Sequence, residues 1–301
     1  MAGLVKNKEK FELVAGLITM GVALLLVLFA ILFLSRCTAE APEAEGTGGN
    51  GTMDTVSTAP TLPALVTNPY NHNDFYPVTD GFMVCSKENA LTGIDVSYHQ
   101  GYIHWDKVAA FNQGETANKN KPTIDFAMVR IGRRFADSGT IQEDPMWLTN
   151  VTGAREHGLL VGVYFFSQAI NPAEALEEAQ FVISLLDGMA LDLPVVFDWE
   201  FMGETDRTAH MDAATLNACA KTFCDAIAAA GYTPMVYFNE DLSSRLLDLQ
   251  QMQYEGYAFW LAKYSTQMTY PYKIQMWQYT DKGVVDGING NVDLNLYFTY
   301  E

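Results

Sequence analysis

Two carboxylates stand close together in the stretch 193–201, which reads Leu-Pro-Val-Val-Phe-Asp-Trp-Glu-Phe. Residues 195–197 form a short apolar run, typical of a strand that is buried on both faces. Side chains alternate along a strand, so Asp198 and Glu200 point to one side and Trp199 to the other. Two residues at about 3.3 Å each separate the two acidic Cα atoms by roughly 6.6 Å. At that spacing two carboxylates can share one sugar, one donating a proton while the other stays charged.

An Asp-x-Glu pair is a weak signal by itself. A chain with 36 acidic residues should contain about one such pair by chance. The competing interpretation is a strand end that meets solvent. The surrounding elements must therefore decide whether the pair belongs to a site.

Apolar, strand-like runs recur from residue 92 onward, with helical patterns between the earlier ones. The expected strands cover 93–97, 126–131, 159–166, 195–197, 233–238, 257–262, 274–279 and 292–298, and the helical segments begin near 106, 149, 171 and 212. This alternation predicts a parallel α/β barrel of the TIM type, with eight strands and about five helices. The last three strands have little helix between them, so we expect the barrel to be irregular.

In such barrels the active site lies at the carboxyl ends of the strands. Polar side chains gather at those ends here: Asp95, Tyr98 and Gln100, then Arg130 and Arg133, Gln168, Asp198 and Glu200, Asn239 and Glu240, Lys263 and Tyr264, and Gln278 and Tyr279. Asp293 is placed differently, near the start of the eighth strand. Strand ends are polar wherever strands meet water, so a solvated edge is the competing interpretation.

The amino-terminal region holds a long uncharged apolar stretch, from Leu13 to Leu34. As a helix it is about 33 Å long, enough to cross a bilayer core, whereas a signal-peptide core spans roughly 7–15 residues. Three lysines precede it and a single arginine follows closely, so residues 1–12 are expected in the cytoplasm and the later chain outside. The sequence predicts an uncleaved, single-pass signal anchor over 13–35 in the cell membrane. A long cleaved signal peptide is the alternative.

Composition divides the rest of the chain. Residues 36–68 are rich in Ala, Glu, Gly, Thr and Pro, which predicts a flexible linker. A lead-in segment over 69–90 carries aromatic residues able to pack against a domain spanning 91–301. The formal net charge of −18 argues against a nucleic-acid partner, because a phosphate backbone favours a basic surface. No metal-ligand spacing occurs among the scattered histidines, so we expect neither metal nor cofactor.

Several short pieces occur in a particular order along the predicted domain. They are Gly-Ile-Asp-Val-Ser-Tyr-His-Gln-Gly at 93–101 with Trp-Asp at 105–106, Phe-Ala-Met-Val-Arg-Ile-Gly at 126–132, Asp144, Gly-Val-Tyr-Phe at 162–165, Asp-Trp-Glu at 198–200, Trp-Leu-Ala-Lys-Tyr at 260–264, Trp-Gln-Tyr at 277–279 and Gly-Asn-Val-Asp-Leu-Asn at 290–295. One piece would be weak, but the ordered set is strong. It resembles glycoside hydrolase family 25, the cell-wall muramidases of the Chalaropsis type.

The resemblance implies retaining hydrolysis of the β-1,4 bond between N-acetylmuramic acid and N-acetylglucosamine in peptidoglycan. By position, Glu200 is then the general acid/base that protonates the leaving oxygen. Asp198 stabilises the substrate's own 2-acetamido group as it attacks the anomeric carbon, and Asp95 and Asp293 are the family's further acidic site residues. The implied substrate-binding residues are Tyr98, Gln100, Arg130, Tyr164, Trp260, Tyr264, Gln278 and Tyr279.

The residue chemistry is consistent with these roles. Glu200 needs a raised pKa to carry a proton at neutral pH, and neighbouring carboxylates push the pKa in that direction. Asp198 must stay charged to stabilise positive charge that develops at the sugar. Neither a nucleophile from the protein nor a metal is required.

Two features depart from the family pattern. Arg133 stands where many relatives carry an aromatic residue after Arg-x-Gly, which puts one sugar subsite in doubt. No wall-binding repeat is recognisable, and the predicted anchor can substitute for one by holding the enzyme beneath the wall. Two alternatives stay open: a non-catalytic, membrane-tethered peptidoglycan-binding protein, and a glycosidase acting on another N-acetylated polymer. The presence of all four acidic residues disfavours the binding protein, which needs no acid and stabilising carboxylate together.

Overall fold

The computed structural model describes residues 61–110 and 123–300, which belong to one structural unit, Ala59–Glu301. The predicted cytoplasmic segment 1–12, the membrane anchor 13–35 and most of the linker lie outside the described residues. Within the described ranges, no helix has the length and apolar character needed to cross a membrane.

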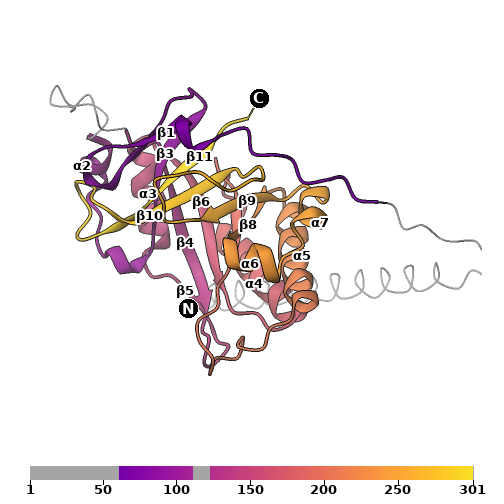
Figure 1. Ribbon diagram of the computed structural model, residues 1–301. Coiled ribbons are helices and arrows are strands. Elements are labelled where there is room, and N and C mark those ends of the chain that lie inside the picture. Colours follow the sequence, from indigo (N-terminus) through magenta and orange to yellow (C-terminus); the bar gives the residue numbers. More distant parts are fainter. Residues whose placement is uncertain (1–60, 111–122, 301) are drawn as a thin grey trace, which may run out of the picture. The chain divides into compact units, whose positions relative to one another are not determined.

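Eight strands close into a barrel (Figure 1). In chain order they are β3 (Ala90–Val96), β4 (Phe126–Arg134), β6 (Leu160–Ser167), β7 (Val195–Trp199), β8 (Pro234–Asn239), β9 (Ala258–Ala262), β10 (Met276–Gly283) and β11 (Val292–Phe298). They pair in the order β3-β11-β10-β9-β8-β7-β6-β4, and β3 pairs with β4 to complete the ring. The predicted eight-stranded barrel is confirmed. An additional strand, β5 (Ile141–Glu143), pairs antiparallel with the end of β4.

One strand runs against the others. β11 is antiparallel to both β10 and β3, so the expectation of a wholly parallel barrel is wrong at this strand. Residues 284–291 connect β10 to β11, which is shorter than the crossover of about a dozen residues that parallel neighbours require. The start of β11 therefore lies at the same end of the barrel as the carboxyl ends of β3 and β10.

Six α-helices lie within the described residues. They are α2 (Trp105–Ala110), α3 (Trp147–Glu156), α4 (Pro172–Leu186), α5 (Ala213–Ala229), α6 (Glu240–Arg245) and α7 (Leu249–Tyr254). The side chains of Asn171 and Asp212 accept backbone N–H groups at the starts of α4 and α5, so the expected helix starts are confirmed. The short helices α6 and α7 were not expected, although Asn239 and Asp248 cap them in the same way.

Two apolar clusters result from the alternation of side chains along the strands. The inner cluster fills the barrel and consists of Phe126, Met128, Leu193, Val196, Met235, Tyr237, Ala258, Trp260 and Met276. A larger cluster includes the other strand faces, the inward faces of the helices and the lead-in. Gly93 allows the inner cluster to close, because a Cβ there would lie 2.4 Å from the Phe126 ring. The inner cluster therefore closes the middle of the barrel to ligands.

The lead-in packs on the barrel as expected. It forms a hairpin of β1 (Phe75–Pro77) and β2 (Met83–Cys85). The Tyr70 ring stacks on Phe298 with 4.3 Å between centroids, and the Phe75 ring meets Trp277 edge-on at 5.2 Å. Because no helix separates β10 from β11, this hairpin covers apolar side chains that a helix would otherwise bury.

The expected linker ends earlier than residue 68. Gln250 Nε2 on α7 donates to the carbonyl oxygens of Leu62 and Pro63 at 3.0 and 2.8 Å, and the Val66 N–H donates to Gln253 Oε1 at 2.8 Å. Composition missed this ordered part, because the partners of these backbone groups are side chains almost 190 residues away.

Candidate active site

A polar cavity of about 340 Å³ opens at the end of the barrel where the parallel strands finish. Its wall is formed by Asp95, Ser97, His99, Gln100, Arg130, Tyr164, Phe166, Asp198, Glu200, Tyr237, Trp260, Tyr264, Gln278 and Asp293. All four acidic residues predicted for the site are among them. The four carboxyl groups therefore face one space.

Strand geometry brings the four carboxyl groups together. Asp198 and Glu200 face the cavity at the end of β7, whereas Trp199 between them is 2% exposed and packs in the larger apolar cluster. This is the alternation that the sequence predicted. Asp293 reaches the cavity from the start of β11, where it pairs directly with Asp95 near the end of β3.

Asp95 is held by two side-chain amides. Gln278 Nε2 and Asn295 Nδ2 donate to its Oδ2 at 2.9 and 2.7 Å. Each amide is itself oriented, because the Trp260 indole N–H donates to Asn295 Oδ1 and the Tyr237 hydroxyl donates to Gln278 Oε1, both at 2.9 Å. The network fixes the Asp95 carboxyl in one direction and makes Trp260 and Tyr237 rigid parts of the wall.

Arg130 brings positive charge into this wall, and its own position is fixed by Asp144. Arg130 Nε and Nη2 both lie 2.9 Å from Asp144 Oδ2. Asp144 also accepts the backbone N–H groups of Tyr98 and Met146. The side chains of Arg130 and Asp144 are almost fully buried, so this paired charge is held rigidly beside the carboxyl groups.

Burial raises the pKa of all four carboxyl groups. For Asp95 the pKa rises to about 6, opposed by the hydrogen bonds from Asn295 and Gln278. For Asp293 burial, helped by the charge of Asp95, raises the pKa to about 8. Burial raises the pKa of Glu200 as well, and nearby Asp95 adds to the effect. The raised pKa of Glu200 is the property that a general acid needs.

Asp198 departs from the expectation that it stays charged. It is 5% exposed, and its Oδ1 has no hydrogen-bond partner among the described residues. Burial and the neighbouring Glu200 carboxyl raise its pKa well above the usual range. A donor placed against Oδ1 would favour the charged form and lower that pKa again. Among the described residues nothing supplies that donor, which is why the pKa of Asp198 stays raised.

Ten of the twelve predicted site residues line the cavity. Tyr98 stands beside the wall, where its ring packs against the Arg130 guanidinium. Tyr279 points to the outside of the barrel, is 2% exposed, and accepts the Met83 N–H at 3.3 Å. Its predicted role in substrate binding is wrong, because Gln278 faces inward and the next residue on a strand must face outward.

Four wall residues were missed by the sequence analysis: Ser97, His99, Phe166 and Tyr237. The alternation of strand side chains was a signal for two of them. Phe166 lies two residues after Tyr164, and Ser97 lies two residues after Asp95. The same rule that rejects Tyr279 would have included both.

Other polar residues at the strand ends stabilise the fold and do not line the cavity. Gln168 Nε2 donates to the Glu200 carbonyl oxygen at 2.8 Å, and the Thr208 hydroxyl donates to Gln168 Oε1 at 2.9 Å. The ammonium group of Lys263 pairs with Glu240. Gln168 thus supports the backbone that carries Glu200 without lining the cavity.

Residues 94–288, more than half of the chain, match the family model described as Glycosyl hydrolases family 25. The chain belongs to glycosyl hydrolase family 25. The enzyme class that the ordered motifs implied, a glycoside hydrolase of the lysozyme type, is confirmed by this match together with the lysozymes among its relatives.

Relatives of this family 25 chain include YegX of Escherichia coli K12, which is 26% identical over 77% of this chain and 78% of its own length. The autolytic lysozyme of Clostridium acetobutylicum is 25% identical over 68% of this chain and 55% of its own. Among solved structures, the modular autolysin LytC of Streptococcus pneumoniae, in complex with a synthetic peptidoglycan ligand, matches 76% of this chain with a TM-score of 0.59 and 26% identity. The chain covers 49% of LytC.

Proposed function

We propose that the protein is a peptidoglycan N-acetylmuramidase that cleaves the β-1,4 bond between N-acetylmuramic acid and N-acetylglucosamine with retention of configuration. Membership of family 25 and the lysozyme and autolysin relatives support this function. The observation that carries it is the pair at the end of β7, in which Glu200 has a raised pKa beside the unsatisfied Oδ1 of Asp198.

Glu200 acts first as the acid. Its proton passes to the glycosidic oxygen as the bond from that oxygen to the anomeric carbon breaks, so the leaving sugar departs as an alcohol. The carbonyl oxygen of the substrate's own 2-acetamido group attacks the same carbon from the other side, which gives a cyclic oxazolinium intermediate. Water then attacks the anomeric carbon, and the Glu200 carboxylate takes its proton. Two inversions give net retention.

Asp198 guides the acetamido group through this step. The amide N–H of the substrate donates to the Asp198 carboxylate, which lines the cavity. This bond favours the charged carboxylate and turns the acetamido oxygen toward the anomeric carbon. As the ring becomes positive, the buried carboxylate stabilises it without reorganisation of solvent.

We also propose that residues 13–35 anchor the enzyme in the cell membrane as a single pass, with the amino terminus in the cytoplasm and the hydrolase domain facing the wall. The uncharged run of 22 residues from Leu13 to Leu34 and the lysines before it support this arrangement. An epitope at each end of the full chain tests it in intact spheroplasts. Added protease should remove the carboxyl-terminal epitope and spare the amino-terminal one; loss of neither or both contradicts the topology.

Digestion of purified peptidoglycan by the full chain tests the activity. Products are reduced with borohydride and identified by mass spectrometry, with the Glu200→Gln protein as control. Reduced muramic-acid ends that depend on Glu200 are the expected result. Binding without new ends would favour the non-catalytic wall-binding protein, and cleavage of chitin in preference to peptidoglycan would favour a glycosidase for another polymer.

A further inference from the structure

Three arginines near the end of β4 differ in how their charges are balanced. Arg130 is paired with Asp144, and the buried Arg134 is paired with Glu178 at 2.7 Å. Arg133 has no carboxylate within ion-pair distance among the described residues. Its guanidinium is therefore available to an anion from outside the chain.

An irregularity in β4 turns Arg133 toward the cavity. Residues three apart on a regular strand face opposite sides. In the pairing of β4 with β6, however, Arg130 is the partner of Tyr164 and Arg133 is the partner of Phe166, with a register shift between them. Tyr164 and Phe166 both line the cavity. The extra residue in β4 therefore places both arginines on the strand face that Tyr164 and Phe166 share, with Arg130 in the cavity wall and Arg133 beyond it.

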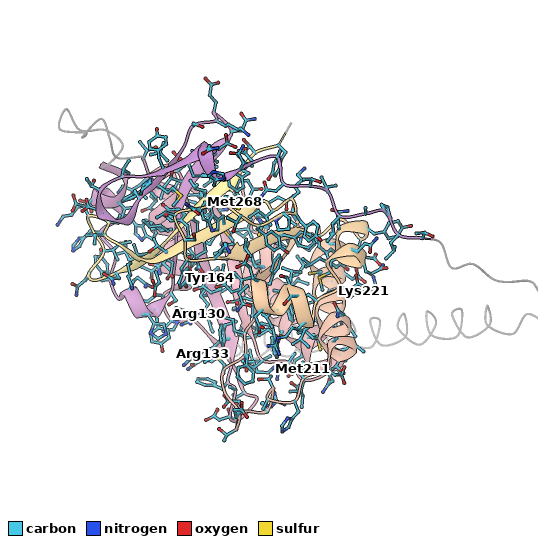
Figure 2. The ribbon with its side chains drawn as sticks, viewed as in Figure 1. Arg130, Arg133, Tyr164, Met211, Lys221 and Met268 are labelled. Carbon is cyan, nitrogen blue, oxygen red and sulfur yellow. The ribbon has the colours of Figure 1, made fainter. Side chains whose placement is uncertain are left out.

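Stacking holds the Arg133 guanidinium in place. Its central carbon lies 4.1 Å from the centroid of the Phe135 ring and 5.4 Å from that of Tyr98. Arg130 lies 4.9 Å from the same Tyr98 ring, so the two arginines stand together at the edge of the cavity. Figure 2 labels both arginines in the same part of the molecule as Tyr164, the β6 partner of Arg130. Arg133 Nη2 also makes a long contact of 3.5 Å with Oε1 of the exposed Gln142 side chain. Stacking leaves the in-plane N–H donors open to a bidentate acceptor that replaces this contact.

The charge around the site makes this arginine selective. Four carboxyl groups line the cavity, and Arg130 among the wall residues is already neutralised by Asp144. The described wall therefore offers an anionic group of the substrate no unpaired arginine or lysine, whereas Arg133 beside it has no carboxylate partner among the described residues.

We propose that Arg133 is a specificity-determining residue that binds a carboxylate of the peptidoglycan next to the cleaved bond. This inference rests on the proposed muramidase function and identifies the substrate group that the site recognises beside the cleaved bond. Two sources share the chemistry: a carboxylate of the peptide stem on an intact strand, or the lactyl carboxylate of muramic acid after the stem has been removed. The stem is the source expected in intact wall, because its attachment converts the lactyl carboxylate to an amide.

The test compares the full-length wild type with Arg133→Gln and Arg133→Lys on three substrates. These are intact peptidoglycan, peptidoglycan whose carboxylates have been amidated, and glycan strands whose stems have been removed by an amidase. Arg155→Gln is the matched control, because Arg155 on α3 is a partly exposed arginine paired with Asp192, outside the cavity wall.

On intact peptidoglycan, Arg133→Gln should raise KM about three- to tenfold, the range of a charge-assisted bidentate contact, with kcat within about twofold of wild type. Arg133→Lys should recover part of the loss, and Arg155→Gln should match wild type. The difference should vanish on amidated peptidoglycan. On stripped strands a persisting difference assigns the contact to the lactyl carboxylate, and its disappearance assigns it to the stem.

Equal KM values for wild type and Arg133→Gln on intact peptidoglycan overturn the proposal, as does a difference that survives amidation. The proposed function is judged separately, by turnover of the wild type. If no turnover occurs, sedimentation with peptidoglycan in the Glu200→Gln background still measures the contribution of Arg133 to binding.

Discussion

Asp293 on β11 and Asp95 on β3 are direct partners in the antiparallel pairing of these strands. The reversed direction of β11 brings the beginning of one strand level with the end of the other. As a result two acidic residues almost 200 positions apart belong to one cavity. The charge of Asp95 also helps to raise the pKa of Asp293.

Replacing Glu200 by Gln should remove the acid and keep the shape of the site. Loss of a general acid lowers kcat by about 10²–10⁴-fold, whereas binding to peptidoglycan should remain within about twofold of wild type. Release of reducing ends and sedimentation with the wall measure the two quantities. Glu204→Gln, at an exposed glutamate of the same loop, should behave as wild type. Comparable activity in Glu200→Gln would remove Glu200 as the acid.

Asp198→Asn should lower kcat by about 10²–10⁴-fold, because a neutral amide cannot stabilise the positive charge of the oxazolinium intermediate. A loss smaller than about tenfold would rule out the substrate-assisted role. The stereochemistry of the wild-type reaction is measured separately, by NMR of the newly formed reducing end at early times. The β-anomer should form first with wild type, and an initial α-anomer would contradict retention.

The raised pKa of Asp293 predicts how stability changes with pH. In the unfolded chain this carboxyl loses its proton near its usual pKa of about 4, whereas in the folded protein it does so near pH 8. Between those values the folded state holds the additional proton, so stability falls as the pH rises through this window.

Asp293→Asn should therefore reduce the fall in unfolding temperature between pH 5 and pH 9. At pH 9 the variant should unfold about 2–4 °C above wild type, the change that about 1 kcal/mol produces in a protein of this size. Part of the slope should remain, because Asp95 and Asp198 have raised pKa values too. Calorimetric scans across the range provide the measurement, and parallel curves for the two proteins would refute the assignment.

Substitution of Glu178 on α4 tests how much its buried ion pair with Arg134 on β4 contributes to stability. Its fully buried carboxylate accepts Arg134 Nε at 2.7 Å and the Ser167 hydroxyl at 2.6 Å. Glu178→Ala should lower the free energy of unfolding by about 3–5 kcal/mol, because it leaves a buried charge with less compensation. Glu177→Ala is the control, since Glu177 pairs with the same arginine but is 65% exposed. That change should cost about 1 kcal/mol or less. Denaturant titrations measure both; equal losses would show that burial is not the deciding factor.

Local chemistry explains why so much of the barrel could be predicted. Each strand is a local apolar run, and the earlier strands are separated along the sequence by helical segments. The helix caps Asn171 and Asp212 bind backbone N–H groups of the residues that directly follow them. The Asp198 and Glu200 pair was predictable for the same reason, since alternation along a single strand decides which way both side chains point. The same alternation explains why the prediction for Tyr279 failed, since this residue follows the inward-facing Gln278 and faces outward.

The sequence by itself determined the eight strands, the helices between the earlier ones and the acidic pair, because each depends on neighbours along the chain. Only the tertiary structure decided which distant residues meet. It paired Asp293 with Asp95, joined Asn295 to the same carboxyl, and held residues 62–66 against α7. It also decided the raised pKa values, because burial depends on the whole barrel. The register shift that turns Arg133 toward the cavity belongs to this second class, since a bulge exists only between two paired strands.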